Sequence, residues 1–399
     1  MTFDALWLLA LPLFFGLGWL ASRLDARSAR SATGGLPDAY FRGLNFLLNE
    51  QPDKAIDAFV DVVRVDPETI ELHFALGNLF RRRGETDRAI RVHQNLADRS
   101  DIRADEREHA LFELGQDFLK AGLLDRAEDV FNQLEGSRYR AAALHHRLQI
   151  AQMVRDWRQA IELAERLHQD LGENRAREIA QFECELAASR LDVSAAGTVP
   201  GPDLLDAVRD AIGRAADADP SHPRPWLMRG QLAILEDEPM RAVEAWRRML
   251  AISPAHVALI ATDWIDAHRR IGRLEDGIAD LERLLAEHAS VDVLFAIFDA
   301  RVARDGRALA IRWLERALRD APSLLGLEKL LAARVEHVDE GERADLDLTL
   351  SLIQGQVRRL SRYVCSHCGF KARTYYWQCP GCSRWDAYVP RRGEELERG

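Results

Sequence analysis

A sequence pattern that returns after about 34 residues is the feature that most constrains how this chain can fold. The pattern places a small residue, an aromatic residue and an alanine at fixed offsets, first as Gly43, Phe46 and Ala55 and then as Gly77, Phe80 and Ala89. Small residues let two helices approach closely, and aromatic side chains fill the groove between them. The pattern therefore predicts pairs of packed helices that repeat along the chain.

Further copies of the pattern extend the array toward the C-terminus. They are marked by Gly115, Phe118 and Ala127, by Gly230, Ala242 and Trp246, and by Ala310 and Ala317. The period and the residue types are typical of the tetratricopeptide repeat. We predict an all-α fold with a tetratricopeptide-repeat solenoid over residues 38–335 and a capping helix over 336–362. Val193–Pro202 departs from the pattern, since it is longer than a repeat turn should be.

The first residues predict a membrane anchor. Ala5–Ala21 is an uncharged apolar run of 17 residues, at the short end of the range of roughly 17–25 for a spanning helix. Asp4 precedes the run, and the positive charges follow it, at Arg23, Arg27 and Arg30. Positive charge favours the cytoplasmic side, so we expect a transmembrane helix over 1–22 with its N-terminus outside, and a juxtamembrane tether over 23–37. A cleaved signal peptide and a buried helix are the alternatives.

Four of the five cysteines form two C-x-x-C pairs near the C-terminus, at Cys365, Cys368, Cys379 and Cys382. Two such turns can place four thiolates around one metal ion. We predict a small zinc-ribbon or rubredoxin-like domain over residues 363–392 and a tail over 393–399. Gly369 and Gly381 would let the backbone turn under the sulfurs. The expected ion is a structural zinc in a closed site, with rubredoxin-type iron or disulfides as alternatives.

Basic and aromatic side chains are interleaved through the predicted ribbon, where Asp386 is the only acid from residue 356 to residue 392. The aromatic residues are Tyr375, Tyr376, Trp377 and Trp385. They could stack on bases, but we favour a small core of the ribbon itself. The basic rim would then face the acidic repeats, an acidic partner or anionic lipid headgroups. We expect His367 to be exposed rather than a ligand, and Cys184 to be a buried apolar residue.

The sequence contains no pattern that proposes an active site. It has no H-E-x-x-H, no phosphate-cradling glycine loop and no G-x-S-x-G. We therefore predict a protein that is not an enzyme, with no catalytic residue and no cofactor-binding residue besides the metal ligands. The formal net charge of −10 argues against non-specific binding of nucleic acid.

The anchor, the array and the ribbon, in this order, resemble the lipopolysaccharide assembly protein B family. These are heat-shock-associated inner-membrane proteins of Gram-negative bacteria. The likeness is carried by Asn45-Phe46-Leu47-Leu48, Leu76-Gly77-Asn78-Leu79-Phe80, Arg88-Ala89-Ile90-Arg91, Asp125-Arg126-Ala127-Glu128, Cys365-x-x-Cys368-Gly369-Phe370 and Trp377-x-Cys379-Pro380-x-Cys382-x-x-Trp385.

The resemblance implies a membrane-anchored adaptor that restrains lipopolysaccharide synthesis. Members of the family help deliver the deacetylase that commits precursors to lipid A to a membrane AAA+ metalloprotease, and a lipopolysaccharide-sensing inner-membrane regulator opposes them. The resemblance also implies a single-pass inner-membrane protein with a periplasmic N-terminus and a cytoplasmic bulk, which needs both its anchor and its four cysteines. The alternatives are an RNA-binding or redox protein acting through the ribbon, or a general scaffold for lipopolysaccharide biosynthetic enzymes. The sequence also allows a homo-oligomer.

Overall fold

The computed structural model describes residues 41–43, 45, 46, 49, 51–65, 70–194, 201–335, 340–360 and 362–396. The predicted anchor and tether lie outside these residues, as does most of Val193–Pro202. Among the described residues, no helix combines the length and the apolar character that a bilayer crossing requires. The chain divides into two compact units, Met1–Ile150 and Ala151–Gly399, and each is described by itself.

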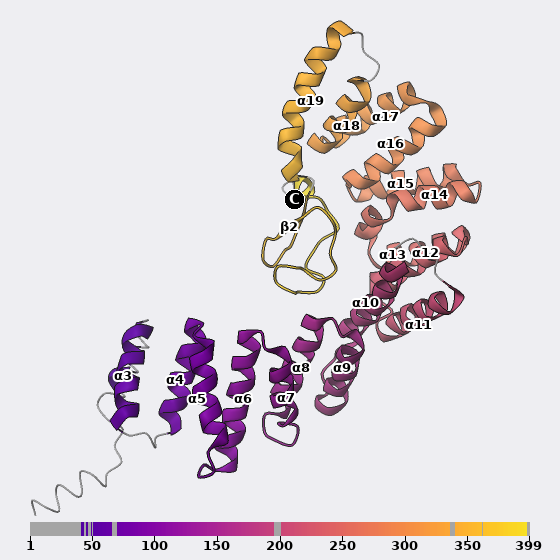
Figure 1. Ribbon diagram of the computed structural model, residues 1–399. Coiled ribbons are helices and arrows are strands. Elements are labelled where there is room, and N and C mark those ends of the chain that lie inside the picture. Colours follow the sequence, from indigo (N-terminus) through magenta and orange to yellow (C-terminus); the bar gives the residue numbers. More distant parts are fainter. Residues whose placement is uncertain are drawn as a thin grey trace, which may run out of the picture. The chain divides into compact units, whose positions relative to one another are not determined.

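The first unit consists of consecutive helices that pack against one another (Figure 1). They are α3 (Pro52–Val65), α4 (Ile70–Arg83), α5 (Thr86–Asp98), α6 (Ala104–Ala121), α7 (Leu124–Asn132) and α8 (Arg140–Val154), whose end belongs to the second unit. Their apolar stripes meet in clusters that bury Phe59, Phe80 and Phe131. The helix pairs that the sequence pattern predicts are thus present.

The second unit continues the array and ends in the ribbon (Figure 1). Its helices are α9 (Trp157–Leu171), α10 (Ala176–Ser194), α11 (Pro202–Ala218), α12 (Pro223–Leu235), α13 (Pro239–Ile252), η1 (Pro254–Leu259), α14 (Ala261–Arg270), α15 (Leu274–Glu287), α16 (Val291–Asp305), α17 (Arg307–Asp320), α18 (Leu324–Val335) and α19 (Glu340–Leu360). The large core of this unit is centred on the fully buried Trp246 and Trp264. The chain is therefore a helical tetratricopeptide solenoid with a small C-terminal ribbon.

The ribbon contains little regular secondary structure. β1 (Tyr363–Val364) pairs antiparallel with β2 (Lys371–Ala372), and α20 (Gly393–Leu396) ends the described chain. The preceding helix, α19, packs along α18 and buries Val357 against Val291 and Leu325. This contact packs α19, the helix that leads into the ribbon, against α16 and α18.

Glycines in the first helix of a repeat face rings in the second helix, sixteen residues further along the chain. The pairs are Gly43 and Phe59, Gly77 and His93, Gly115 and Phe131, and Gly230 and Trp246. A Cβ added to these glycines would lie 2.5, 2.4, 2.6 and 2.1 Å from the nearest ring atom, respectively. The small residue of the pattern is therefore required by a ring that touches the backbone of the facing helix.

The ring in the second repeat is a histidine, which the sequence pattern did not predict to be part of the core. His93 and Asp117 are fully buried, and Nδ1 of His93 lies 2.5 Å from Oδ2 of Asp117. Nη1 of Arg81 donates to Oδ1 of the same carboxylate at 2.8 Å. The hydrogen bond of Nδ1 to a buried carboxylate helps this polar ring to be tolerated between the helices, although its buried Nε2 has no hydrogen-bond partner among the described residues.

We predict that Gly230→Ala destabilises the second unit by about 1–3 kcal/mol, because its methyl group overpacks the buried Trp246. The indole Nε1 of Trp246 also donates to the Leu227 carbonyl at 3.2 Å, so the ring cannot move freely. Gly213→Ala in α11 is the matched control, since nothing lies within 4 Å of the added Cβ. It should stabilise the helix by up to about 1 kcal/mol. Thermal melting followed by circular dichroism would contradict the prediction if both variants melted alike.

Candidate metal centre and its docking surface

The four cysteines that the sequence singles out come together in the ribbon. Their Sγ atoms all lie within 4.8 Å of one another. The Cys365 and Cys382 sulfurs are 3.9 Å apart, and the Cys368 and Cys379 sulfurs are 3.7 Å apart. Four thiolates at 2.3 Å from a tetrahedral ion have S–S edges of about 3.8 Å. The donor set therefore fits one four-coordinate metal ion, and all four thiols are free of disulfides.

Each C-x-x-C turn is closed by the residue that follows its second cysteine. Gly369 has a φ of 74° and donates its N–H to the Cys365 carbonyl, and Ser383 has a φ of 56° and donates to the Cys379 carbonyl. Gly381 lies within the second turn, as the sequence analysis expected, but the residue with the left-handed backbone there is Ser383. Gly381 donates its N–H to the Cys379 sulfur at 3.4 Å, a contact that can offset thiolate charge.

The other two residues that the sequence analysis weighed agree with their predicted roles. His367 is exposed, and its Nδ1 lies 2.7 Å from Nη1 of Arg384 rather than among the sulfurs. Cys184 is fully buried in α10, and burial raises the pKa of its thiol to about 12. Neither residue can serve as a fifth ligand here.

Two tryptophans of the ribbon pack against the solenoid of the second unit. The Trp385 ring lies 6.0 Å from Trp157 and 5.9 Å from Phe182, both at steep interplanar angles, and its Nε1 donates to Oε1 of Gln152 at 3.0 Å. The ring of Trp377 stacks on His256 with a centroid distance of 5.4 Å.

These contacts differ from the expectation that all four aromatic residues form the ribbon's own core. The buried core of the ribbon contains Tyr363 and Tyr388, with Tyr375 packed against them, whereas Tyr376 is 42% exposed. The tryptophans leave this core because it is too small to hold them, and the solenoid buries their apolar surface instead.

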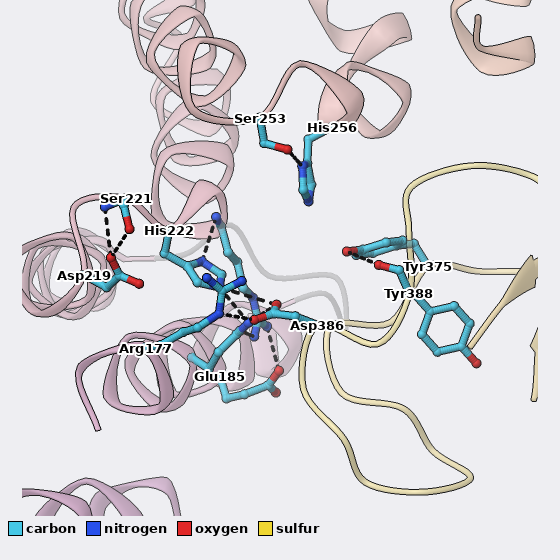
Figure 2. A network of polar contacts seen from close by, with 12 residues as sticks. Arg177, Glu185, Asp219, Ser221, His222, Ser253, His256, Tyr375, Asp386 and Tyr388 are labelled. Atoms are coloured by element: carbon cyan, nitrogen blue, oxygen red, sulfur yellow. Dashed lines mark hydrogen bonds and ion pairs between the residues drawn. The ribbon is translucent and has the colours of Figure 1, made fainter. Parts of the chain in front are cut away.

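Asp386 makes polar contacts between the docked ribbon and the solenoid. Figure 2 shows its carboxylate reaching toward Arg177 and His222. Oδ2 accepts from Nε of Arg177 at 2.7 Å, and Oδ1 accepts from Nε2 of Gln181 at 2.7 Å. Burial alone would raise the pKa of Asp386, but the interactions with His222 and Arg177 hold this pKa below its ordinary value. The sequence marked Asp386 only as the single acid of a basic stretch.

The last described residues fasten the ribbon to two solenoid helices. Glu394 is 5% exposed and accepts from the backbone N–H groups of Leu324 and Leu325, at the N-terminus of α18. Glu395 accepts from the N–H of Val291, at the N-terminus of α16. Carboxylates at these ends satisfy N–H groups that have no partner within the helix. Residues 393–396, the described part of the predicted tail, form α20 and cap the first turns of these two helices.

Arg392 strengthens this attachment. Its guanidinium makes two hydrogen bonds to the Asp292 carboxylate, at 2.9 and 2.8 Å. Here the basic rim of the ribbon faces an acid of the repeats, which is one of the alternatives that the sequence analysis gave. No sequence period could have paired these residues, which lie 100 positions apart.

Comparisons with known proteins agree with this architecture. Residues 363–390 match the family model of the rubredoxin metal binding domain, and residues 42–105 match that of the tetratricopeptide repeat. Lipopolysaccharide assembly protein B of Escherichia coli strain K12 is 36% identical over 389 residues, which are 96% of this chain and 97% of that protein. The Haemophilus influenzae protein of the same name is 27% identical over 398 residues, with 97% and 98% covered.

The solved structures that match this chain share little sequence with it. The C-terminal part of a tetratricopeptide repeat-containing protein from Cytophaga hutchinsonii is 12% identical, with 67% of this chain and 95% of that chain covered and a TM-score of 0.38. The two bacterial relatives, by contrast, match along the repeats and the ribbon together.

We predict that Cys379→Ser removes the metal and releases the ribbon, because ligand thiolates supply folding energy at such a site. Metal content by plasma mass spectrometry should fall from one zinc ion per chain to a small fraction of that. Trp377 and Trp385 should become solvated, which shifts the tryptophan emission to longer wavelength. Cys184→Ala is the control, since this buried thiol lies outside the cluster, and it should keep the metal. Full metal content in Cys379→Ser would contradict the assignment of Cys379 as a metal ligand. Bound iron in the wild type would show that the ion is iron and not zinc.

We also predict that acid weakens the docking of the ribbon through His256. Burial lowers the pKa of His256 to about 4, with His222 adding to the shift and Asp386 opposing it. Arg177 and the Ser253 hydroxyl are the other groups that act on this ring. An unfolded histidine titrates near 6.5, so stability is complete above that pH and is lost as the pH falls toward 4. The loss through this residue should reach about 2 kcal/mol at pH 5.

The measurement is the melting temperature of wild type and His256→Phe between pH 7.5 and pH 5, with bound metal quantified at each pH. Phenylalanine keeps a ring under Trp377 but cannot bind a proton, so the variant should lose less stability on acidification. Parallel pH curves for the two proteins would contradict the role of His256. Comparing them at equal metal content separates this effect from protonation of the cysteines.

Proposed function

The chain belongs to the lipopolysaccharide assembly protein B family, and from this premise we propose that it regulates lipopolysaccharide assembly as a non-enzymatic adaptor at the inner membrane. The observation that carries the proposal is the match to relatives of that name along nearly the whole chain. A solenoid of helix pairs supports it, because such arrays present extended surfaces to other proteins.

In this proposal, residues 1–22 hold the chain in the inner membrane, with the N-terminus in the periplasm and the bulk in the cytoplasm. The apolar run Ala5–Ala21 and the arginines that follow it support this orientation. The repeats bind the deacetylase that commits precursors to lipid A and present it to a membrane AAA+ metalloprotease. A lipopolysaccharide-sensing inner-membrane regulator acts against this delivery.

The metal centre has a structural task in the proposal. Four thiolates leave no open position for a substrate on a tetrahedral ion, which supports zinc rather than a catalytic metal. When bound, the ion cross-links the two C-x-x-C turns. Contacts of Trp377, Trp385 and Asp386 with the solenoid then hold the ribbon in its docked position.

RNA binding through the ribbon receives less support. Stacking on bases needs accessible aromatic faces, and the two tryptophans are engaged by His256, Trp157 and Phe182. The exposed aromatic residues that remain in the described ribbon include Phe370 and Tyr376. The adaptor therefore accounts for more of the ribbon's residues than a nucleic-acid-binding role does.

We predict that loss of this protein lengthens the half-life of the lipid A deacetylase in living cells. The half-life would be followed by immunoblot after translation is stopped, in cells that lack the chromosomal copy and carry a plasmid. The wild-type chain should restore rapid turnover, whereas a chain without residues 1–22 and the Cys379→Ser chain should not. The reason is that the first cannot reach the membrane protease and the second loses the docked ribbon.

The matched control is Cys184→Ala, which changes a cysteine outside the metal cluster and should restore turnover. Equal amounts of each chain must be present, as shown by an antibody to the protein. A deacetylase half-life that does not depend on the plasmid would overturn the adaptor proposal. Normal turnover with Cys379→Ser would remove the ribbon from the mechanism while leaving the adaptor in place.

A further inference from the structure

The docked ribbon covers one side of α12, and the opposite side of this helix carries a pocket. Arg224 points at the ribbon, with its guanidinium 5.3 Å from the centre of the Trp377 ring. Trp226 follows two positions later, and side chains at that spacing point about 200° apart around a helix. A pocket of about 450 Å³ lies at Trp226, between α11, α12 and α13. This pocket stays open while the ribbon is docked.

Two arginines without acidic partners cover the indole in this pocket. The guanidinium carbons of Arg229 and Arg248 lie 4.7 and 4.3 Å from the centre of the Trp226 ring. Both arginines are exposed, and in the part of the chain that the structure describes neither has a carboxylate within ion-pair distance. A guanidinium that lies on an aromatic face keeps its N–H edge available for a bidentate acceptor.

The remaining cations at the rim of the pocket are already paired. Arg209 forms ion pairs with Asp206 and Glu236. Arg241 pairs with Glu238 at 2.6 Å. Arg229 and Arg248 are therefore the cations of this pocket that can take an incoming anion.

The rim also carries negative charge that limits which anion can bind. Glu236 and Glu244 line the same pocket, and they would repel a polyanion such as nucleic acid or an anionic membrane surface. The floor, by contrast, is apolar and consists of Leu232, Ala233 and Ala245. Such a site suits a single carboxylate that is attached to an apolar group.

We propose that this pocket binds a peptide segment of a partner protein that carries an aspartate or glutamate next to an apolar side chain. Arg229 and Arg248 hold the carboxylate by charge-assisted hydrogen bonds. The neighbouring apolar side chain lies on Leu232, Ala233 and Ala245. The inference goes beyond the adaptor function, because it names the chemistry of a partner segment and does not depend on which protein supplies it.

The test begins with a phage-displayed library of random heptapeptides. The library is first absorbed on the Arg229→Gln, Arg248→Gln double variant and then selected on the wild-type protein with its metal bound. The enriched sequences should contain an acidic residue beside an apolar one. Enrichment of peptides without an acidic residue would overturn the proposal.

The enriched peptide is then synthesised with a fluorescent label, and its binding is measured by fluorescence anisotropy. We expect binding to weaken at least about tenfold in the double variant and when the acidic residue of the peptide is replaced by its amide. Arg247→Gln is the matched control, because this neighbouring arginine on α13 is exposed but does not line the pocket. It should leave the affinity unchanged.

A second pair of substitutions guards against a folding defect. Arg229→Lys with Arg248→Lys keeps both charges but loses the bidentate geometry, so it should melt like the wild type and bind at an intermediate level. Equal binding by the wild type and both double variants would overturn the proposal. Tighter binding of a phosphoserine version of the peptide, or of vesicles rich in anionic lipid, would overturn it in favour of a phosphate site.

Discussion

The fold and the docking of the ribbon depend on four sulfurs that can share one metal ion. The ribbon has two strands of two residues each, and a segment this small rarely folds on its own apolar core. Its docking residues follow closely on the ligands in sequence, since Trp377 precedes Cys379 by two positions and Asp386 follows Cys382 by four. The geometry around the ion therefore sets where these side chains can reach.

The ribbon changes the mechanics of the array to which it is docked. In a solenoid each repeat contacts only its neighbours, so the stiffness of the array depends on the contacts between adjacent repeats. The docked ribbon contacts Gln152 on α8, Arg177 on α10, His256 in η1 and the N-termini of α16 and α18. It thereby links helices from the beginning to the end of this unit, in addition to the direct contacts of α16 with η1 and with α18. A partner that approaches this unit must either displace the ribbon or bind to a surface that the ribbon leaves free.

Local patterns could be predicted from the sequence, and long-range pairs could not. The glycine positions follow from the period of the repeat, although His93 was not predicted as the ring that faces Gly77, and the C-x-x-C spacing fixes the metal ligands. The pairs Arg177–Asp386 and Gln152–Trp385 are separated by 209 and 233 residues, and no period links them. Two features of the sequence could have indicated docking, namely a lone acid among basic residues and two large tryptophans in a short ribbon, but the sequence analysis assigned the aromatic residues to the ribbon's own core. Neither feature identifies the residues of the solenoid that contact Asp386 and the tryptophans.

The apolar and polar contacts of the docked ribbon have different consequences. Burying Trp377 and Trp385 removes large apolar surfaces from water, which favours docking wherever a matching surface exists. Burying Asp386 costs desolvation free energy, which its partners recover only in one arrangement. Arg177, Gln181 and His222 supply that arrangement. The tryptophans therefore provide most of the affinity, and Asp386 selects one position of the ribbon over alternatives that bury the same apolar area.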